Sequence, residues 1–266
     1  MRCVYINLAQ AGRRRAHMEA EFARIAPEGV ALERFQAVDP ATAAALPGEI
    51  RAPEKACFLS HRSAIAAHHD GETPLFVLED DVLLSGEAFG APALPPGDDW
   101  DLLFTDTILA DPGTWIRLAK SRPELARTGR IRVIDLAGVG FAGAAAYVVN
   151  GRSKDRVLAA LDGLGPLDLP YDIALRRLVH AGRLRACVAF PFLTSVAPFS
   201  AETSQIQPGG NAADAISDAF RRLMFVGRDI AESRAEAEAI AASADEESRL
   251  VGLILAGVVS DRFGPK

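Results

Sequence analysis

Cysteine is scarce in this chain, and its few cysteines lack the spacing of a metal or redox motif. The 266 residues include three cysteines: Cys3, Cys57 and Cys187. An odd number of widely separated cysteines argues against a disulfide framework, and no C-x-x-C pair is present. We therefore expect a reducing compartment and predict a cytoplasmic protein.

Excess basic charge and long apolar stretches are also missing. Lys and Arg number 29 against 35 Asp and Glu, a net charge of −6, so we expect no nucleic-acid partner. The longest charge-free stretch, residues 136–151, holds four glycines and an asparagine, whereas a spanning helix needs about 20 predominantly apolar residues. Residues 1–8 are too short for the apolar region of a signal peptide. We predict no transmembrane segment; a peripheral contact at the inner face of a membrane stays open.

The composition and patterning are those of a globular α/β protein. Hydrophobic residues make up 49% and charged residues 24%. Short apolar runs alternate with amphipathic segments through the first 190 residues, which favours a mostly parallel, Rossmann-type sheet. The predicted strands are residues 4–8, 30–38, 75–78, 101–105, 131–136 and 184–190. The predicted helices are residues 13–25, 54–69, 152–161 and 172–181.

The character changes after Pro198, which divides the predicted domain organisation. We predict a catalytic domain over residues 1–210 and a helical C-terminal extension over residues 211–266. Residues 212–263 hold ten acids and six bases, unlike a basic helix that lies on a membrane surface. Residues 251–259 are apolar but short, and we expect a helix there that packs onto the domain. We expect residues 40–53, 110–130 and 200–211 to be loops.

The stretch from Leu75 to Val82 carries three consecutive carboxylates, Glu79, Asp80 and Asp81, after a buried strand. Ligands of such sheets bind beyond the carboxyl ends of the strands. In an extended chain Glu79 and Asp81 share one face and Asp80 takes the other. Two carboxylates on one face suit Mg²⁺ or Mn²⁺. The alternative is a solvated strand end.

Three further positions are candidates for chemistry. His61 falls on the apolar face of its predicted helix, either as a buried histidine bonded to a carbonyl or as a substrate contact. The run Arg13-Arg14-Arg15 opens a helix, where cations are unfavourable, so a bound diphosphate or a set of surface arginines would account for it. Asp172 stands where a helix starts, as an N-cap or as a general base.

These stretches together resemble glycosyltransferase family 25, which comprises bacterial lipooligosaccharide galactosyltransferases and collagen-modifying relatives. The resemblance covers roughly residues 2–207. The stretches that carry it are Tyr5-Ile6-Asn7-Leu8 with Arg13-Arg14-Arg15, Glu54-Lys55-Ala56-Cys57-Phe58-Leu59-Ser60-His61, Phe76-Val77-Leu78-Glu79-Asp80-Asp81-Val82-Leu83, and, more weakly, Gly143 to Val149 and Pro170-Tyr171-Asp172.

The resemblance implies a GT-A-like fold and an inverting hexosyltransferase that uses a UDP-sugar, most often UDP-galactose, with Mn²⁺ or Mg²⁺. The acceptor would be a glycan or glycolipid such as the lipopolysaccharide core. Asp81 and Glu79 would hold the metal. Asp172 would be the general base, with Asp106 as the alternative candidate for that role. The residues expected to contact the nucleotide sugar are Asn7, Leu8, Arg14, Lys55, His61, Glu79 and Asp80.

Two other classes of function stay open at this point. One is a catalytically silent protein of the same fold that binds nucleotide sugars or serves as a scaffold. The other is a phosphoryl-transfer or receiver-type domain, which also gathers acids at strand ends. That second class expects an acidic pair after the first strand, where this chain has Asn7-Leu8-Ala9-Gln10. The donor sugar, the acceptor and the oligomeric state do not follow from the sequence.

Overall fold

A seven-stranded sheet organises the molecule. The computed structural model describes residues 1–90, 97, 99–200 and 212–259, with side chains omitted at 212–215 and 255–259. The strand order is β2-β1-β3-β9-β5-β10-β7, and all but β9 and β7 run in one direction. The strands are β1 (Arg2–Asn7), β2 (Leu32–Gln36), β3 (Leu75–Glu79), β5 (Leu102–Phe104), β7 (Arg132–Asp135), β9 (Ala146–Val149) and β10 (Ala186–Phe190). The predicted α/β class with a mostly parallel, Rossmann-like sheet is confirmed.

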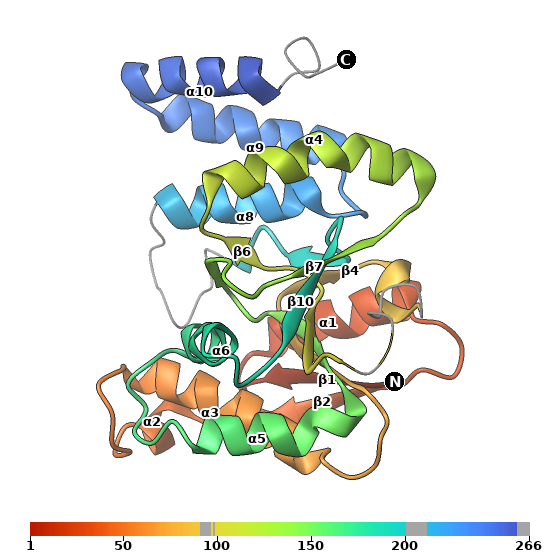
Figure 1. Ribbon diagram of the computed structural model, residues 1–266, viewed down its shortest axis with the longest axis vertical. Helices are drawn as coiled ribbons and strands as arrows, with labels where there is room; N and C mark the ends of the chain where they lie inside the picture. The colour runs from red at the N-terminus through yellow and green to blue at the C-terminus, as the bar shows by residue number, and fades with distance from the viewer. Residues whose placement is uncertain (91–96, 98, 201–211, 260–266) are drawn as a thin grey trace.

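Helices surround this sheet, and a group of them forms one end of the molecule (Figure 1). Two short ribbons, β4 (Val82–Leu84) with β11 (Thr194–Val196) and β6 (Ile108–Leu109) with β8 (Phe141–Ala142), lie beside it. The α-helices are α1 (Gly12–Ile25), α2 (Pro40–Ala43), α3 (Ala52–Ala67), α4 (Pro112–Thr128), α5 (Lys154–Asp162), α6 (Tyr171–His180), α8 (Ala212–Met224), α9 (Ile230–Ser243) and α10 (Glu246–Val259). The described residues also form the 3₁₀ helices η1 (Gly86–Phe89) and η3 (Gly151–Ser153).

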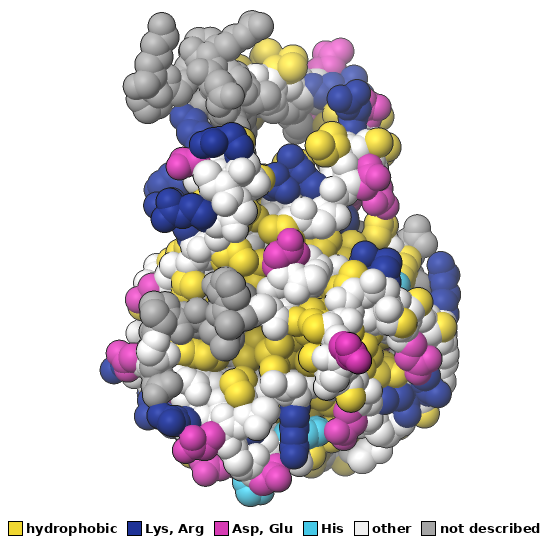
Figure 2. Space-filling model, turned by 90° about the vertical axis from the view of Figure 1, so that its right-hand side faces the viewer, with side chains coloured by type: hydrophobic (Ala, Val, Ile, Leu, Met, Phe, Trp, Pro, Cys, Tyr) yellow, Lys and Arg dark blue, Asp and Glu magenta, His cyan; other side chains and the backbone are white. Residues whose placement is uncertain are grey.

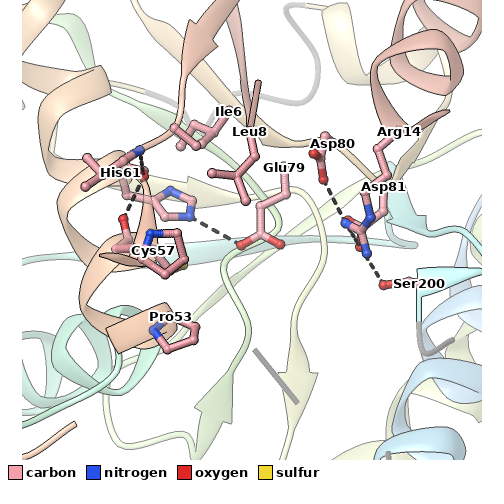
Figure 3. A pocket seen from close by; sticks show the side chains of 15 residues that line it. Ile6, Leu8, Arg14, Pro53, Cys57, His61, Glu79, Asp80, Asp81 and Ser200 are labelled. Atoms are coloured by element: carbon pink, nitrogen blue, oxygen red, sulfur yellow. Dashed lines mark hydrogen bonds and ion pairs between the residues drawn. The ribbon is translucent and has the colours of Figure 1, made fainter. Parts of the chain in front are cut away.

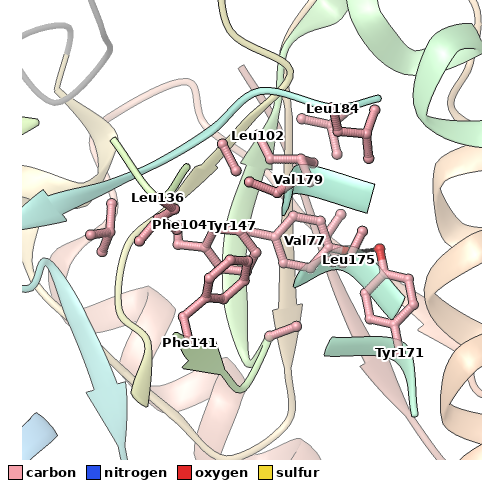
Figure 4. Packing of buried hydrophobic residues seen from close by; sticks show 14 of the residues in the cluster. Val77, Leu102, Phe104, Leu136, Phe141, Tyr147, Tyr171, Leu175, Val179 and Leu184 are labelled. Atoms are coloured by element: carbon pink, nitrogen blue, oxygen red, sulfur yellow. Dashed lines mark hydrogen bonds between the residues drawn. The ribbon is translucent and has the colours of Figure 1, made fainter. Parts of the chain in front are cut away.

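The apolar strands are buried on both faces, because successive side chains enter different cores. In β3, Val77 joins a core with α3, α5 and α6, whereas Phe76 and Leu78 join a second core with Met18 and Phe22 of α1. Figure 4 shows the first core, in which the aromatic rings of Phe104, Phe141, Tyr147 and Tyr171 gather among aliphatic side chains. This two-sided burial explains why the central strands read as continuous apolar runs.

Several predicted loops are ordered elements. Residues 110–130, expected as a loop, form α4, in which Asp111 caps the N-terminus by accepting hydrogen bonds from the backbone of Gly113 and Thr114. Residues 40–43 form the short helix α2. The ribbon strands β4, β6 and β11 were not predicted, because strands of two or three residues carry too little periodicity. Residues 201–211, the other predicted loop, lie outside the described residues.

The helical C-terminal extension is present, but the described side chains of its last helix are not buried against the domain as expected. In α10 the side chains of Leu250, Val251, Leu253 and Ile254 are exposed, at 59%, 48%, 72% and 61%. Figure 2 shows hydrophobic side chains between charged ones at this end of the molecule. Within the described ranges, no helix combines the length and apolarity needed to span a bilayer.

Candidate functional site

Two adjoining cavities open where the parallel strands end. Cavity A, about 200 Å³, lies beside α1 and α3 and is lined by Leu8, Arg14 and Asp80 among others. Cavity B, about 380 Å³, is bounded by α6 and α8 and is lined by Gly143 and Asp172 among others. Their shared wall consists of Cys57, His61, Glu79, Asp81 and Ser200. The carboxyl edge of the sheet, where the sequence predicted a ligand site, therefore holds both cavities.

Asp80 is held from two sides and faces cavity A. Its Oδ1 accepts a hydrogen bond from Arg14 Nη1 at 2.7 Å, and its Oδ2 accepts one from Asn7 Nδ2 at 2.7 Å. Burial raises the pKa of the Asp80 carboxyl, and the Arg14 guanidinium offsets this only in part. Asn7 is 1% exposed and its amide also contacts Ala11 and Arg34, so it positions Asp80 and lines neither cavity.

Asp81 has one satisfied and one unsatisfied oxygen. Its Oδ2 accepts hydrogen bonds from Arg14 Nη1 at 2.9 Å and from Ser200 Oγ at 2.5 Å (Figure 3). Its Oδ1 is buried and has no hydrogen-bond partner among the described residues. A buried carboxylate oxygen in that state calls for a ligand, since unsatisfied buried acceptors are costly.

Glu79 points the other way, toward α3, and ends a buried chain of hydrogen bonds. Its Oε1 lies 3.3 Å from His61 Nε2, His61 Nδ1 lies 3.0 Å from the Tyr147 hydroxyl, and that hydroxyl lies 2.8 Å from the Tyr171 hydroxyl. The His61 ring also stacks on the Tyr171 ring at 4.4 Å. Every hydrogen bond is satisfied if Tyr171 donates to Tyr147, Tyr147 to Nδ1, and Nε2–H to Glu79.

His61 does not bond a backbone carbonyl, which was one of the two alternatives for it. Its ring, 1% exposed, bonds two side chains that come from different strands. Its position on the apolar face of a helix is confirmed; its place in the shared wall makes it more than a core residue.

Cys57 completes a group of potential metal ligands with His61 and Glu79. One ligand atom from each, a sulfur, a ring nitrogen and a carboxylate oxygen, lies within 4.8 Å of the others. Burial, together with the negative charge of Glu79 and Asp172, raises the pKa of the Cys57 thiol well above its usual range. The sequence did not single out Cys57, although its spacing of four from His61 puts both on one helix face.

Asp172 lines cavity B from the first turn of α6. Pro170, not Asp172, is the N-cap residue. Asp172 Oδ2 accepts a hydrogen bond from the backbone of Gly143 at 2.7 Å. Gly143 has a φ of 82°, a conformation that only glycine adopts without strain, so this backbone donor depends on the glycine.

Asp106 is fully buried and lines neither cavity. Its Oδ2 accepts hydrogen bonds from Arg221 Nε at 2.8 Å and Nη2 at 2.5 Å, and Oδ1 accepts one from the Thr194 hydroxyl at 3.2 Å. Arg221 and Asp218 of α8 line cavity B. Asp106 thus anchors α8 to the end of β5. The sequence did not reveal this contact, because Asp106 and Arg221 are 115 positions apart.

Lys55 also makes a structural contact and does not face either cavity. Its side chain is buried, and Nζ donates a hydrogen bond to the carbonyl of Leu46 at 2.6 Å. Lys55 lines neither cavity A nor cavity B. We therefore no longer count it among the candidate nucleotide contacts, whereas Leu8, Arg14, His61, Glu79 and Asp80 stay candidates.

A comparison with known families identifies the segment that supplies most of this site. Residues 1–93 match the model of glycosyltransferase family 25 (LPS biosynthesis protein). The matched segment contains β1, α1, α3 and β3, and with them the acidic turn. The resemblance predicted from the sequence is confirmed over these residues, and it indicates a glycosyltransferase. A search of curated proteins found no match for the chain.

Proposed function

We propose that this protein is a glycosyltransferase of lipopolysaccharide biosynthesis that moves a hexose from a UDP-sugar, most simply UDP-galactose, to a glycan or glycolipid acceptor. The observation that carries the proposal is the shared wall between the cavities, where Glu79 and Asp81 stand at the end of β3. A transferase needs two substrates on either side of one reacting centre. The family 25 match over residues 1–93 supports the same reaction class.

Cavity A suits the nucleotide. Ile6, Leu8 and Val38 offer apolar surface for a base, and Arg14 supplies a cation near the acidic turn. Cavity B suits the acceptor, since it is larger and is bounded by α6 and α8 outside the matched segment. In this arrangement the bond between sugar and diphosphate lies at the shared wall.

The acidic turn fits a divalent cation in part. The Asp81 Oδ1 atom is buried without a hydrogen-bond partner among the described residues, and such an oxygen can serve as a metal ligand. Glu79 is a second oxygen donor in the same wall. Mn²⁺ or Mg²⁺ held by Asp81 and Glu79 would neutralise charge on the departing diphosphate. Arg14 already bonds Asp80 and Asp81 and would add to that positive charge.

Asp172 is the proposed general base for an inverting single displacement. It stands in cavity B, on the acceptor side of the shared wall. The carboxylate accepts the proton of the acceptor hydroxyl as that oxygen attacks the anomeric carbon and the bond to the diphosphate breaks. The hydrogen bond from Gly143 fixes the carboxylate orientation. Asp106 is a poor alternative, because Arg221 occupies its carboxylate. The cytoplasm remains the predicted location of the reaction.

The experiment is a thermal-shift panel of nucleotides and nucleotide sugars, each with and without Mn²⁺, followed by a transfer assay on lipopolysaccharide core acceptors. A ligand that binds only the folded protein raises its melting temperature. We expect UDP-galactose with Mn²⁺ to give the largest shift and to be consumed when acceptor is present. Binding of UDP without hydrolysis or transfer would favour the catalytically silent alternative. No shift with any nucleotide sugar would contradict the proposal.

A further inference from the structure

We propose that Cys57, His61 and Glu79 form a binding site for a divalent metal ion that prefers sulfur and nitrogen ligands, such as Zn²⁺ or Co²⁺. This goes beyond the proposed function, which calls only for a cation held by the oxygens of Asp81 and Glu79. Three different donor types converge here from two elements, α3 and β3. Sulfur and imidazole ligands favour Zn²⁺ and Co²⁺, whereas Mg²⁺ prefers oxygen.

The spacing of the donor atoms suits a tetrahedral ion. Ligand atoms around tetrahedral zinc lie about 3.3–3.8 Å apart, given metal–ligand distances of about 2.0–2.3 Å. His61 Nε2 and Glu79 Oε1 are already 3.3 Å apart, and all three donors lie within 4.8 Å. Cys57 precedes His61 by one helical turn on the same face of α3. The Glu79 side chain is 32% exposed, so it can turn to close the remaining distance.

The surroundings of His61 match those of a metal-bound histidine. Such a histidine normally donates its second ring N–H to an oxygen that fixes the ring. Here Nδ1 faces the Tyr147 hydroxyl at 3.0 Å, and Tyr147 in turn contacts Tyr171 at 2.8 Å. Because both hydroxyls rotate, the chain can reverse: Nδ1–H donates to Tyr147 and Tyr147 donates to Tyr171. Nε2 then presents its lone pair toward Glu79 and Cys57.

The proposed site differs from the neighbouring acidic group in how its negative charge is compensated. Figure 3 shows two groups around cavity A: Asp80, Asp81 and Arg14 to one side, and Glu79, His61 and Cys57 to the other. The first group already contains a guanidinium bonded to both carboxylates. In the second group, a divalent ion with one carboxylate and one thiolate is neutral overall. On binding, the Cys57 thiol loses its proton to solvent as the metal–sulfur bond forms.

The shared wall leaves a fourth coordination position open to solvent. All three donors line both cavities, so an ion at this site faces the position where the substrates would meet. Three protein ligands with one open position are typical of catalytic rather than structural zinc sites. Because Glu79 belongs to both candidate ligand sets, we expect Zn²⁺ here to compete with Mn²⁺ held by Asp81.

The test is a Co²⁺ titration of the metal-free, full-length protein without nucleotide, followed by optical absorption. We expect one equivalent to bind and to give the near-ultraviolet charge-transfer band of a thiolate–cobalt bond. Cys57→Ser should abolish that band, and Glu79→Gln should weaken Co²⁺ binding by at least about 10-fold. Zn²⁺ should displace Co²⁺, whereas excess Mg²⁺ should not.

Matched controls make the outcome decisive. Cys187→Ser removes another half-buried thiol away from the site and should keep the band, and Asp81→Asn should keep it too. Absence of Co²⁺ binding in the wild type, or a band that persists in Cys57→Ser, would overturn the proposal. If Cys57→Ser does not fold, unchanged affinity in Glu79→Gln would overturn it equally. Metal binding without any nucleotide-sugar binding would sustain this inference while the proposed transferase function fails.

Discussion

At the scale of single residues, three consecutive carboxylates acquire three different environments. Glu79 bonds His61, Asp80 bonds Asn7 and Arg14, and Asp81 bonds Arg14 and Ser200. Strand alternation predicted that Asp80 differs from its neighbours, and Asp80 alone of the three does not line cavity B. The partners themselves could not be predicted, because they come from β1, α1, α3 and residue 200. Sequence patterns located the acids but not the charges that compensate them.

Asp81→Asn should remove the metal-dependent part of UDP binding. The amide keeps the size of the side chain but is a weak ligand, and Arg14 retains its bond to Asp80. We expect UDP affinity in the presence of Mn²⁺ to fall to its value without metal, with a loss of unfolding free energy of about 1–3 kcal/mol. Calorimetric titration and chemical denaturation measure the two effects.

The matched control for that variant is Asp80→Asn, which changes the neighbouring carboxylate that faces cavity A alone. It should keep the difference in UDP affinity with and without Mn²⁺. The same difference in Asp81→Asn as in the wild type would mean that Asp81 does not hold the cation.

Asp172→Asn should reduce transfer by about 10²–10⁴, the range for loss of general base catalysis. The amide oxygen can still accept the hydrogen bond from Gly143, so UDP affinity and melting temperature should stay close to those of the wild type. Asp168→Asn is the control, because the Asp168 side chain accepts a hydrogen bond from the backbone N–H of Glu49 and lines neither cavity. Transfer within a few-fold of the wild type in Asp172→Asn would leave Asp172 as an acceptor contact only.

At the scale of elements, α8 is the part of the site that local patterns could not reveal. A helix after residue 211 was predicted, but its attachment rests on contacts remote in sequence. The Phe220 ring stacks on Trp115 of α4 at 4.4 Å, and Arg122 of α4 donates a hydrogen bond to the carbonyl of Phe225. Arg221 reaches Asp106 at the end of β5. These contacts bring α8 to cavity B.

Arg221→Met should destabilise the protein strongly, because it leaves the Asp106 carboxylate buried and unpaired. We expect a loss of about 3–5 kcal/mol of unfolding free energy, measured by chemical denaturation. Adding Asp106→Asn should recover part of that loss, since the buried charge is then removed. The neighbouring Arg222→Met, which breaks a partly exposed pair with Glu236, should cost less. Equal losses of unfolding free energy in the two single variants would show that the buried Arg221–Asp106 pair contributes no more to stability than the partly exposed Arg222–Glu236 pair.

At the scale of the whole molecule, the architecture was more predictable than the site. Central strands such as β1 and β3 are apolar on both faces, so their sequence alone indicates a buried parallel sheet. The acidic turn at the end of β3 could also be located. Cys57, Tyr147, Ser200 and Arg221 could not, because each looks like an ordinary core or loop residue in its own segment. They become site residues only when strand order and helix docking bring them together.

The extent of the folding unit is also a property of the whole molecule, and two truncated chains test where this unit ends. A chain of residues 1–228 lacks α9 and α10, and α9 contains no buried residue. It should melt within a few degrees of the full-length protein and bind UDP equally well. A chain of residues 1–210, the predicted catalytic domain, also lacks α8.

That shorter chain exposes the surface covered by Met224 and Phe225, worth about 1.5–3 kcal/mol each. It also leaves Asp106 unpaired, at a cost of about 3–5 kcal/mol. These losses together approach the whole stability of a typical domain, about 5–15 kcal/mol. We therefore expect residues 1–210 to show no cooperative thermal transition by circular dichroism. A cooperative transition near that of the full-length protein would instead establish the predicted boundary at residues 210 and 211, with α8 as a dispensable appendage.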